Sequence, residues 1–134
     1  LYIPQDLHEM NLYPCAHSVT FNVEGHKLNV ILNQRSQDML TANNWNVVQY
    51  AALVYMLALV NNLEPGKLIH VIANAHIYDR HIALVRELVQ NEQYEAPELI
   101  TNRKVDNFYD ITLGDFALCN YQFSDFKHKI PVAI

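Results

Sequence analysis

Cys15 is the residue whose surroundings best suit covalent chemistry. It follows Pro14 directly and precedes a segment of alternating apolar and polar residues, so we expect it at the start of a strand. A nucleophilic cysteine needs thiolate character, which a nearby cation supplies. Arg35 is a candidate cation if its polar segment folds back over Cys15. Most free cysteines are structural instead, and Cys119, inside an apolar segment, fits that reading better.

A histidine also lies close to Cys15 in the chain. Strand alternation puts His17 on the same face as Cys15, so a Cys–His pair of the kind found in hydrolases is one alternative. Such a pair also needs a third group that orients the histidine, which makes this alternative weak.

The polar segment Gln34–Asp38 has the donors that a phosphate needs. The planar guanidinium of Arg35 can grip phosphate oxygens through two parallel hydrogen bonds, and the Ser36 hydroxyl adds a neutral donor. Asp38 can accept a hydrogen bond from a ring N–H. By itself the segment fits a surface turn with an Arg35–Asp38 ion pair better than a phosphate site.

A second polar group follows the apolar run 68–73. If that strand continues, His76 and Tyr78 point to one side, where both can hydrogen-bond a sugar hydroxyl. Taken alone, the pair fits two half-buried polar aromatic residues at a strand end better. His70 and His81 lie nearby in the chain, which raises the question of a metal cluster. Their spacing matches no common zinc pattern, so we expect no metal.

The elements that must position these residues follow from hydrophobic periodicity and from turn residues. Alternating runs on both sides of Gly25 predict a β-hairpin. Asn44 is expected to cap a helix that is apolar nearly all round, hence central, and that stops at 64–66. We also expect a helical turn after Pro4, strands at 18–23, 27–32, 68–73, 98–101 and 115–121, an irregular or short helical segment at 33–41, and a helix at 82–89. This order predicts an α+β fold with a mixed sheet and packed helices.

Composition narrows the functional class. At 134 residues the chain fits a single domain, residues 1–134, and its charged fraction of 17% is low enough to suggest a large buried surface such as a subunit interface. The net charge of −5 argues against an obligatory nucleic-acid partner. Two cysteines without a disulfide or zinc spacing indicate a reducing compartment, so we expect a cytoplasmic protein. The most apolar window, 45–60, is too short to span a membrane.

Six motifs together resemble thymidylate synthase in order and spacing over essentially the whole chain. They are Pro14-Cys15, Gln34-Arg35-Ser36-x-Asp38, Asn46-x-x-x-Tyr50, Pro65-Gly66, His76-Ile77-Tyr78 and the terminal Val132-Ala133-Ile134. The chain resembles the C-terminal part of that family's domain, with the N-terminal part absent.

The resemblance implies an α/β sandwich that forms a homodimer through the backs of two β-sheets. It implies that dUMP is converted to dTMP with 5,10-methylenetetrahydrofolate as the donor of one carbon and a hydride, without a metal. Cys15 would add to C6 of the uracil and make C5 nucleophilic.

The resemblance also assigns binding roles. Asn46 would read uracil through one acceptor and one donor, and Ala133 belongs to a tail that would close over folate. Asp38 would contact both the pyrimidine and the folate. The full set implied for dUMP is Arg35 and Ser36 at the phosphate, with Gln37, Asp38, Asn46, His76, Ile77 and Tyr78 around the nucleoside.

Two positions depart from the family pattern. Ala16 stands where the family has a histidine after the nucleophile, and Asn74 stands where many members have aspartate. The absent part would supply another phosphate arginine, a glutamate acid–base and part of the folate wall, so the isolated piece is expected to be inactive. The alternatives are a pyrimidine deoxynucleotide hydroxymethylase, a non-catalytic binding fragment and a Cys15–His17 hydrolase.

Overall fold

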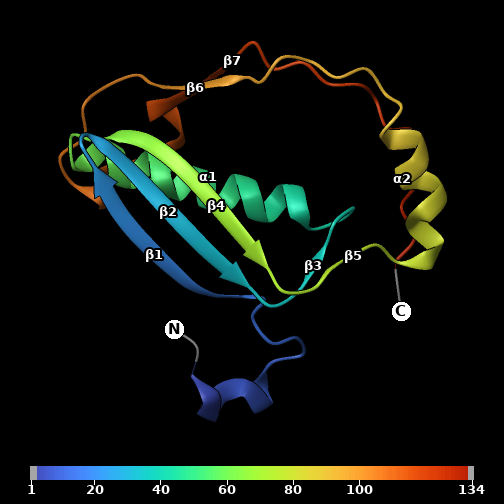
Figure 1. Cartoon of the computed structure of the whole chain (residues 1–134). Coiled ribbons are helices and arrows are strands. Elements are labelled where there is room, and N and C mark those ends of the chain that lie inside the picture. The colour runs from blue at the N-terminus through green and yellow to red at the C-terminus, as the bar shows by residue number, and fades with distance from the viewer. Residues whose placement is uncertain (1–2, 133–134) are drawn as a thin grey trace.

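A three-stranded mixed sheet with one long helix against it forms the centre of the molecule (Figure 1). The structure, a computed structural model, describes residues 3–132. Its helices are α1 (Asn43–Val60) and α2 (Ile82–Leu88), with short 3-10 turns η1 (Pro4–Glu9), η2 (Asp79–His81), η3 (Phe108–Asp110) and η4 (Leu113–Asp115). Its strands are β1 (Ala16–Glu24), β2 (Lys27–Gln34), β3 (Gln37–Asp38), β4 (Glu64–Ile72), β5 (Ala75–His76), β6 (Glu98–Thr101) and β7 (Phe116–Cys119).

The predicted β-hairpin is confirmed. β1 pairs antiparallel with β2, and the turn contains Gly25 at φ 60°, a conformation that glycine adopts without steric cost. β2 also pairs in parallel with β4, so the strand order is β1-β2-β4. A bulge in β1 leaves His17 without a partner between the pairs Ala16–Gln34 and Ser18–Asn33. Side chains no longer alternate regularly across a bulge, so the strand-parity argument that placed His17 on the face of Cys15 is wrong.

β4 begins earlier than the sequence predicts. We expected the long helix to stop at 64–66, but α1 ends at Val60 and residues 64–66 already belong to β4. Pro65 is tolerated because β4 is an edge strand of its sheet. The pairing with β2 shifts register near Gly66, where the Asn29 side chain accepts a hydrogen bond from the Lys67 backbone at 2.9 Å.

The two faces of the sheet have different environments. The inner face, towards α1, contributes Leu28 and Val30, which pack with Val54 and Ala58 of the helix. The outer face carries Ile31, Ile69 and Val71, whose side chains are 39%, 48% and 47% exposed. The apolar run 68–73 suggests a buried strand, but β4 alternates between half-buried and exposed residues and has one exposed face.

Helix α1 covers the inner face, but its start differs from the prediction. Its N-cap residue is Ala42, and no side chain caps it, so Asn44 does not have the capping role that we expected. Although nearly all of its residues are apolar, Trp45 and Val48 are 79% and 66% exposed.

The segment 33–41 was expected to be irregular or a short helix. Gln34 instead completes β2, and Gln37–Asp38 forms β3, which pairs in parallel with β5. A two-residue strand leaves no periodic signal in the sequence. Its partner lies more than thirty residues away, so this pairing depends on tertiary structure.

The remaining elements agree with the sequence. Helix α2 lies at the end of the molecule beyond β5, and β6 pairs antiparallel with β7 to form a separate ribbon (Figure 1). Asp115 joins this ribbon to η4. The Thr112 backbone N–H and the Arg103 guanidinium both donate to its carboxylate and hold its pKa below the ordinary value.

The accessible surface of the chain is larger than that of a compact monomer of the same mass. Its accessible surface is 10152 Å², whereas a compact monomer of this mass exposes about 7,200 Å². Within residues 3–132, no helix has the length and apolar character needed to cross a membrane.

Candidate active site

Cys15 and Arg35 lie side by side at one end of the sheet. Cys15 is half-buried, carries a free thiol and immediately precedes β1. The Arg35 backbone N–H donates to the Cys15 carbonyl oxygen at 2.9 Å. The Arg35 guanidinium donates to the carbonyl oxygens of Tyr13 at 2.7 Å and Pro14 at 3.1 Å. Arg35 therefore lies beside the segment 13–15, through the continuation of the β1–β2 pairing, and its guanidinium contacts backbone oxygens of that segment. Its role as a cation for the Cys15 thiol stays a prediction.

The β3–β5 pair joins the two polar groups predicted from the sequence. Asp38 pairs with His76, the Gln37 N–H donates to the Asn74 oxygen at 2.9 Å, and the Met39 N–H donates to the His76 oxygen at 3.0 Å. Ser36 precedes β3 and is half-buried, and Gln37 is 1% exposed. The segment that contains Arg35 and the segment that contains His76 thus lie next to each other.

The rings of His76 and Tyr78 are in contact. They meet edge to face with their centroids 5.1 Å apart. The strand from Leu68 does not run on to them as we assumed, since β4 stops at Ile72 and β5 is separate. The exposed Ile77 lies between them in the chain, and its side chain is 40% exposed.

Asn46 joins the site through Gln34. Asn46 lies in the first turn of α1, and its side-chain oxygen accepts a hydrogen bond from Gln34 Nε2 at 3.4 Å. Gln34 is the last residue of β2 and precedes Arg35, so Asn46 lies at the same end of the sheet as Cys15.

Asp38 is held as a carboxylate. Burial alone raises its pKa, but hydrogen bonds from the Thr41 hydroxyl and from the backbone N–H groups of Thr41 and Leu40 outweigh this and leave the pKa below its ordinary value. An ionised Asp38 is an acceptor for N–H groups of a ligand.

A cavity of about 300 Å³ adjoins Asp38. It is lined by Asp38, Thr41, Tyr78, His81 and the tail residues Ile130, Pro131 and Val132. His81 Nε2 donates to the Pro131 oxygen at 2.8 Å, and Arg80 donates to the Val132 oxygen at 2.7 Å. The tail is therefore fixed beside Asp38. Ala133, which we expected at the folate site, lies outside the described residues.

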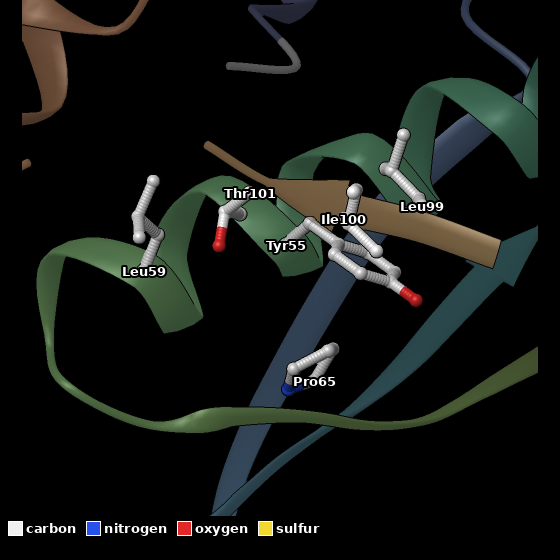
Figure 2. A pocket seen from close by; sticks show the side chains of 6 residues that line it. All are labelled: Tyr55, Leu59, Pro65, Leu99, Ile100 and Thr101. Atoms are coloured by element: carbon white, nitrogen blue, oxygen red, sulfur yellow. The ribbon is translucent and has the colours of Figure 1, made fainter. Parts of the chain in front are cut away.

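Another hollow lies elsewhere and carries none of the expected groups. Figure 2 shows it between α1, β6 and the start of β4, lined by Tyr55, Leu59, Pro65, Leu99, Ile100 and Thr101. Its walls are mainly apolar, and none of the residues implied for dUMP lies on them. We therefore do not include it in the candidate site.

Two further features considered from the sequence are a Cys15–His17 pair and a metal cluster. The His17 side chain is exposed and, in the described part of the chain, has no hydrogen bond to Cys15. Residues 3–132 contain no group of three or more His, Cys, Asp or Glu side chains that could hold a metal ion.

Sequence reasoning missed the contact between two polar residues, the buried Gln34 and the half-buried His70. Their side chains hydrogen-bond each other at 3.1 Å, and Gln34 also contacts Asn46. A signal was present in the alternation. Both residues occupy inward positions, Gln34 after Leu28, Val30 and Leu32, and His70 between Leu68 and Ile72. A polar side chain at an inward position needs a buried partner.

Comparisons with known proteins agree with this geometry. The family model described as thymidylate synthase matches residues 1–134. The chain is 41% identical over 134 residues to a thymidylate synthase of Bacillus subtilis subsp. natto and 42% identical over 134 residues to one of Bacillus licheniformis. In both cases the match covers 100% of this chain and 48% of the relative, so the chain spans about half the length of these relatives.

A solved structure shows the same fold. The thermostable thymidylate synthase A from Bacillus subtilis matches with a TM-score of 0.90 and 40% identity, over 100% of this chain and 48% of that one. This likeness confirms the predicted α+β sandwich.

Proposed function

This chain belongs to the thymidylate synthase family, and we propose that it carries the nucleophile and the nucleotide-binding residues of an enzyme that converts dUMP to dTMP. The carrying observation is the direct hydrogen bonding of Arg35 to the segment Tyr13–Cys15, with Asn46 at the same end of the sheet. A thiol, a cation and a base-reading amide near one another are what covalent chemistry on a pyrimidine nucleotide requires.

The proposed reaction starts at Cys15. Its thiolate adds to C6 of the uracil, and the electron pair moves to C5, which attacks the methylene carbon of 5,10-methylenetetrahydrofolate. Loss of the C5 proton and release of the folate nitrogen leave a methylene group on the ring. The folate then delivers a hydride to that methylene group, the Cys15 sulfur departs, and dTMP and dihydrofolate are formed. Covalent addition divides a difficult substitution into accessible steps.

Arg35 and Ser36 are the proposed phosphate ligands. Two donor atoms of the guanidinium, Nε and one terminal nitrogen, already hold the carbonyl oxygens of Pro14 and Tyr13. A guanidinium has five N–H donors, so others remain for phosphate oxygens. The Arg35 side chain is exposed, which suits a group that meets a charged ligand. Gln37, which is buried next to Ser36 in the chain, is proposed to be part of the same nucleotide-binding segment.

The base and the sugar are assigned to separate residues. Asn46 offers an oxygen to N3–H and an N–H to O4, a pattern that matches uracil. His76 and Tyr78 are proposed to bind the 3′-hydroxyl, and Ile77 lies between them. Their ring contact at 5.1 Å supports this role, because it brings two polar aromatic side chains to one place.

The folate is proposed to bind beside Asp38 and the C-terminal tail. The cavity of about 300 Å³ is lined by the ionised Asp38 carboxylate and by tail residues, which supports this assignment. Ala133 follows the last described tail residue and is proposed to complete the contact.

The proposed enzyme needs protein beyond the described surface. We propose that residues 1–134 are the C-terminal part of one domain, whose other part supplies another phosphate arginine and a glutamate. The accessible surface of 10152 Å² is larger than the roughly 7,200 Å² expected for a compact monomer, which supports this proposal. A homodimer through the outer face is proposed because Ile31, Ile69 and Val71 are exposed there together. The free thiols fit a cytoplasmic setting.

Product analysis tests the proposal. The native protein, expressed at the full length of its gene, is incubated with dUMP and 5,10-methylenetetrahydrofolate, and the nucleotide product is identified by mass spectrometry. We expect 5-methyl-dUMP, that is dTMP, together with dihydrofolate. A product with one more oxygen identifies a hydroxymethylase instead, and a folate-independent turnover would point to a hydrolase. Absence of any product from the folded protein would contradict the proposal.

A further inference from the structure

A cluster of four polar side chains lies under the proposed base site. Gln34 and Gln37 are 2% and 1% exposed and are two of the few polar residues buried in the described chain. Asn46 and His70 are half-buried beside them. Burying an amide is costly unless its oxygen and nitrogen find partners. The arrangement of donors and acceptors in this cluster is therefore constrained.

The orientation of Gln34 is determined from both ends. Its Nε2 donates to the Ser36 backbone oxygen at 2.8 Å, and a backbone oxygen can only accept. Its Oε1 lies 3.1 Å from His70 Nε2, so the histidine must donate there. A flipped Gln34 would place its oxygen against the Ser36 oxygen and lose that hydrogen bond, and with the His70 proton on Nε2 it would lose the second one as well.

The orientation of Gln34 in turn fixes the amide of Asn46. Gln34 Nε2 has two N–H groups. One donates to the Ser36 oxygen, and the other is shared between the Gln37 side-chain oxygen and Asn46 Oδ1, which lies 3.4 Å away. At 3.4 Å the link to Asn46 is near the long limit of a hydrogen bond, so it depends on Gln34 being held at its other end. Asn46 Oδ1 keeps a second lone pair for a ligand, and its Nδ2 keeps its donors.

This orientation matters for base choice. An asparagine with its oxygen towards N3 and its nitrogen towards the exocyclic position matches uracil, whereas the flipped amide matches cytosine, which has an acceptor at N3 and a donor at C4. We propose that His70, acting through Gln34, is a positioning residue that holds Asn46 in the uracil-reading orientation and so favours dUMP over dCMP. The inference rests on the proposed function and adds a specificity determinant to the same site.

The state of His70 is consistent with this role. Burial lowers its pKa, so the ring is neutral near neutral pH and carries one N–H. The tautomer with the proton on Nε2 is the one that the Gln34 oxygen requires.

Variants at His70 test the inference by comparing two ligands. His70→Phe keeps a ring of similar size and removes the donor. In His70→Gln the side-chain nitrogen is the same number of bonds from Cβ as His Nε2, so the donor is restored. His26→Phe, at an exposed turn residue, is the matched control. The dissociation constants of dUMP and dCMP are measured by calorimetry on the native full-length protein.

We expect His70→Phe to reduce the preference for dUMP over dCMP about tenfold, the value of one hydrogen bond. His70→Gln should recover most of that preference, and His26→Phe should leave it unchanged. A His70→Phe protein that binds both nucleotides with an unchanged ratio, or weaker by one common factor, overturns the inference. If the unaltered protein binds dCMP but no dUMP, the proposed function itself fails.

A second measurement needs no variant. Nitrogen-15 NMR of the histidine rings distinguishes the two neutral tautomers. We expect the His70 proton on Nε2, and a proton on Nδ1 with a bare Nε2 would overturn the inference even if every variant at this position failed to fold.

Discussion

Replacing Gly66 with alanine should destabilise the sheet that positions the site. Gly66 lies where β4 shifts register against β2, and a Cβ there would come within 2.8 Å of the Leu28 backbone oxygen and 3.0 Å of its carbonyl carbon. It would lie closer still to Asn29 Oδ1, which accepts from the Lys67 backbone. The Leu28 atoms are backbone of a paired strand and can move only if the pairing changes.

The size of the effect follows from these contacts. Overpacking of this kind costs about 1–3 kcal/mol, and disturbing the Asn29–Lys67 hydrogen bond adds about 1 kcal/mol. The smaller entropy of an unfolded chain with alanine offsets about 0.4–1 kcal/mol. We therefore expect Gly66→Ala to lower the free energy of unfolding by about 2 kcal/mol.

Urea unfolding followed by circular dichroism measures this difference. Gly114→Ala is the matched control, because a Cβ at Gly114 meets nothing closer than Thr112 Oγ1 at 3.7 Å. The control should change the free energy of unfolding by less than about 1 kcal/mol. If Gly66→Ala is as stable as the Gly114→Ala protein, the close approach of β4 to β2 does not limit the fold and the reasoning is refuted.

Three further predictions concern the site and its supports. Arg35→Lys should weaken dUMP binding at least about tenfold, because an ammonium cannot hold two backbone oxygens and a phosphate together; unchanged affinity by calorimetry would contradict this. Because the Thr112 N–H and other donors depress the pKa of Asp115, its contribution to the free energy of unfolding is present above pH 3.8 and is lost as the pH falls further. In urea unfolding over this pH range, the free energy of unfolding should fall less with pH in Asp115→Asn than in the unaltered protein. An equal fall in both proteins would refute this prediction. Arg80→Ala removes the hydrogen bond to the Val132 oxygen and should make limited proteolysis of the segment 130–132 about tenfold faster, whereas an unchanged rate would show that other contacts hold this segment.

Local patterns predicted the parts of the fold that depend on neighbouring residues. The hairpin follows from alternation on both sides of Gly25, and α2 follows from its helical spacing. Elements that depend on distant partners were missed. β3 has only two residues and exists because it pairs with β5. β4 contains Pro65 because it is an edge strand, and its pairing with β2 resumes after one extra residue on β4.

The same distinction holds for the candidate site. The approach of Arg35 to Cys15 was predictable because the two residues flank paired strands. The contacts of Gln34 were not predictable, because its partners His70 and Asn46 come from distant segments of the chain. The parity argument for His17 failed at a bulge that local sequence does not mark.

The central claim is that Cys15 is the nucleophile. Intact-mass spectrometry of the native protein incubated with 5-fluoro-dUMP and 5,10-methylenetetrahydrofolate should show a covalent ternary adduct, and peptide mapping should place it on Cys15. Cys119→Ser, which alters the other thiol of this chain, should retain the adduct, whereas Cys15→Ser should lose it. An adduct that survives in Cys15→Ser would contradict the account.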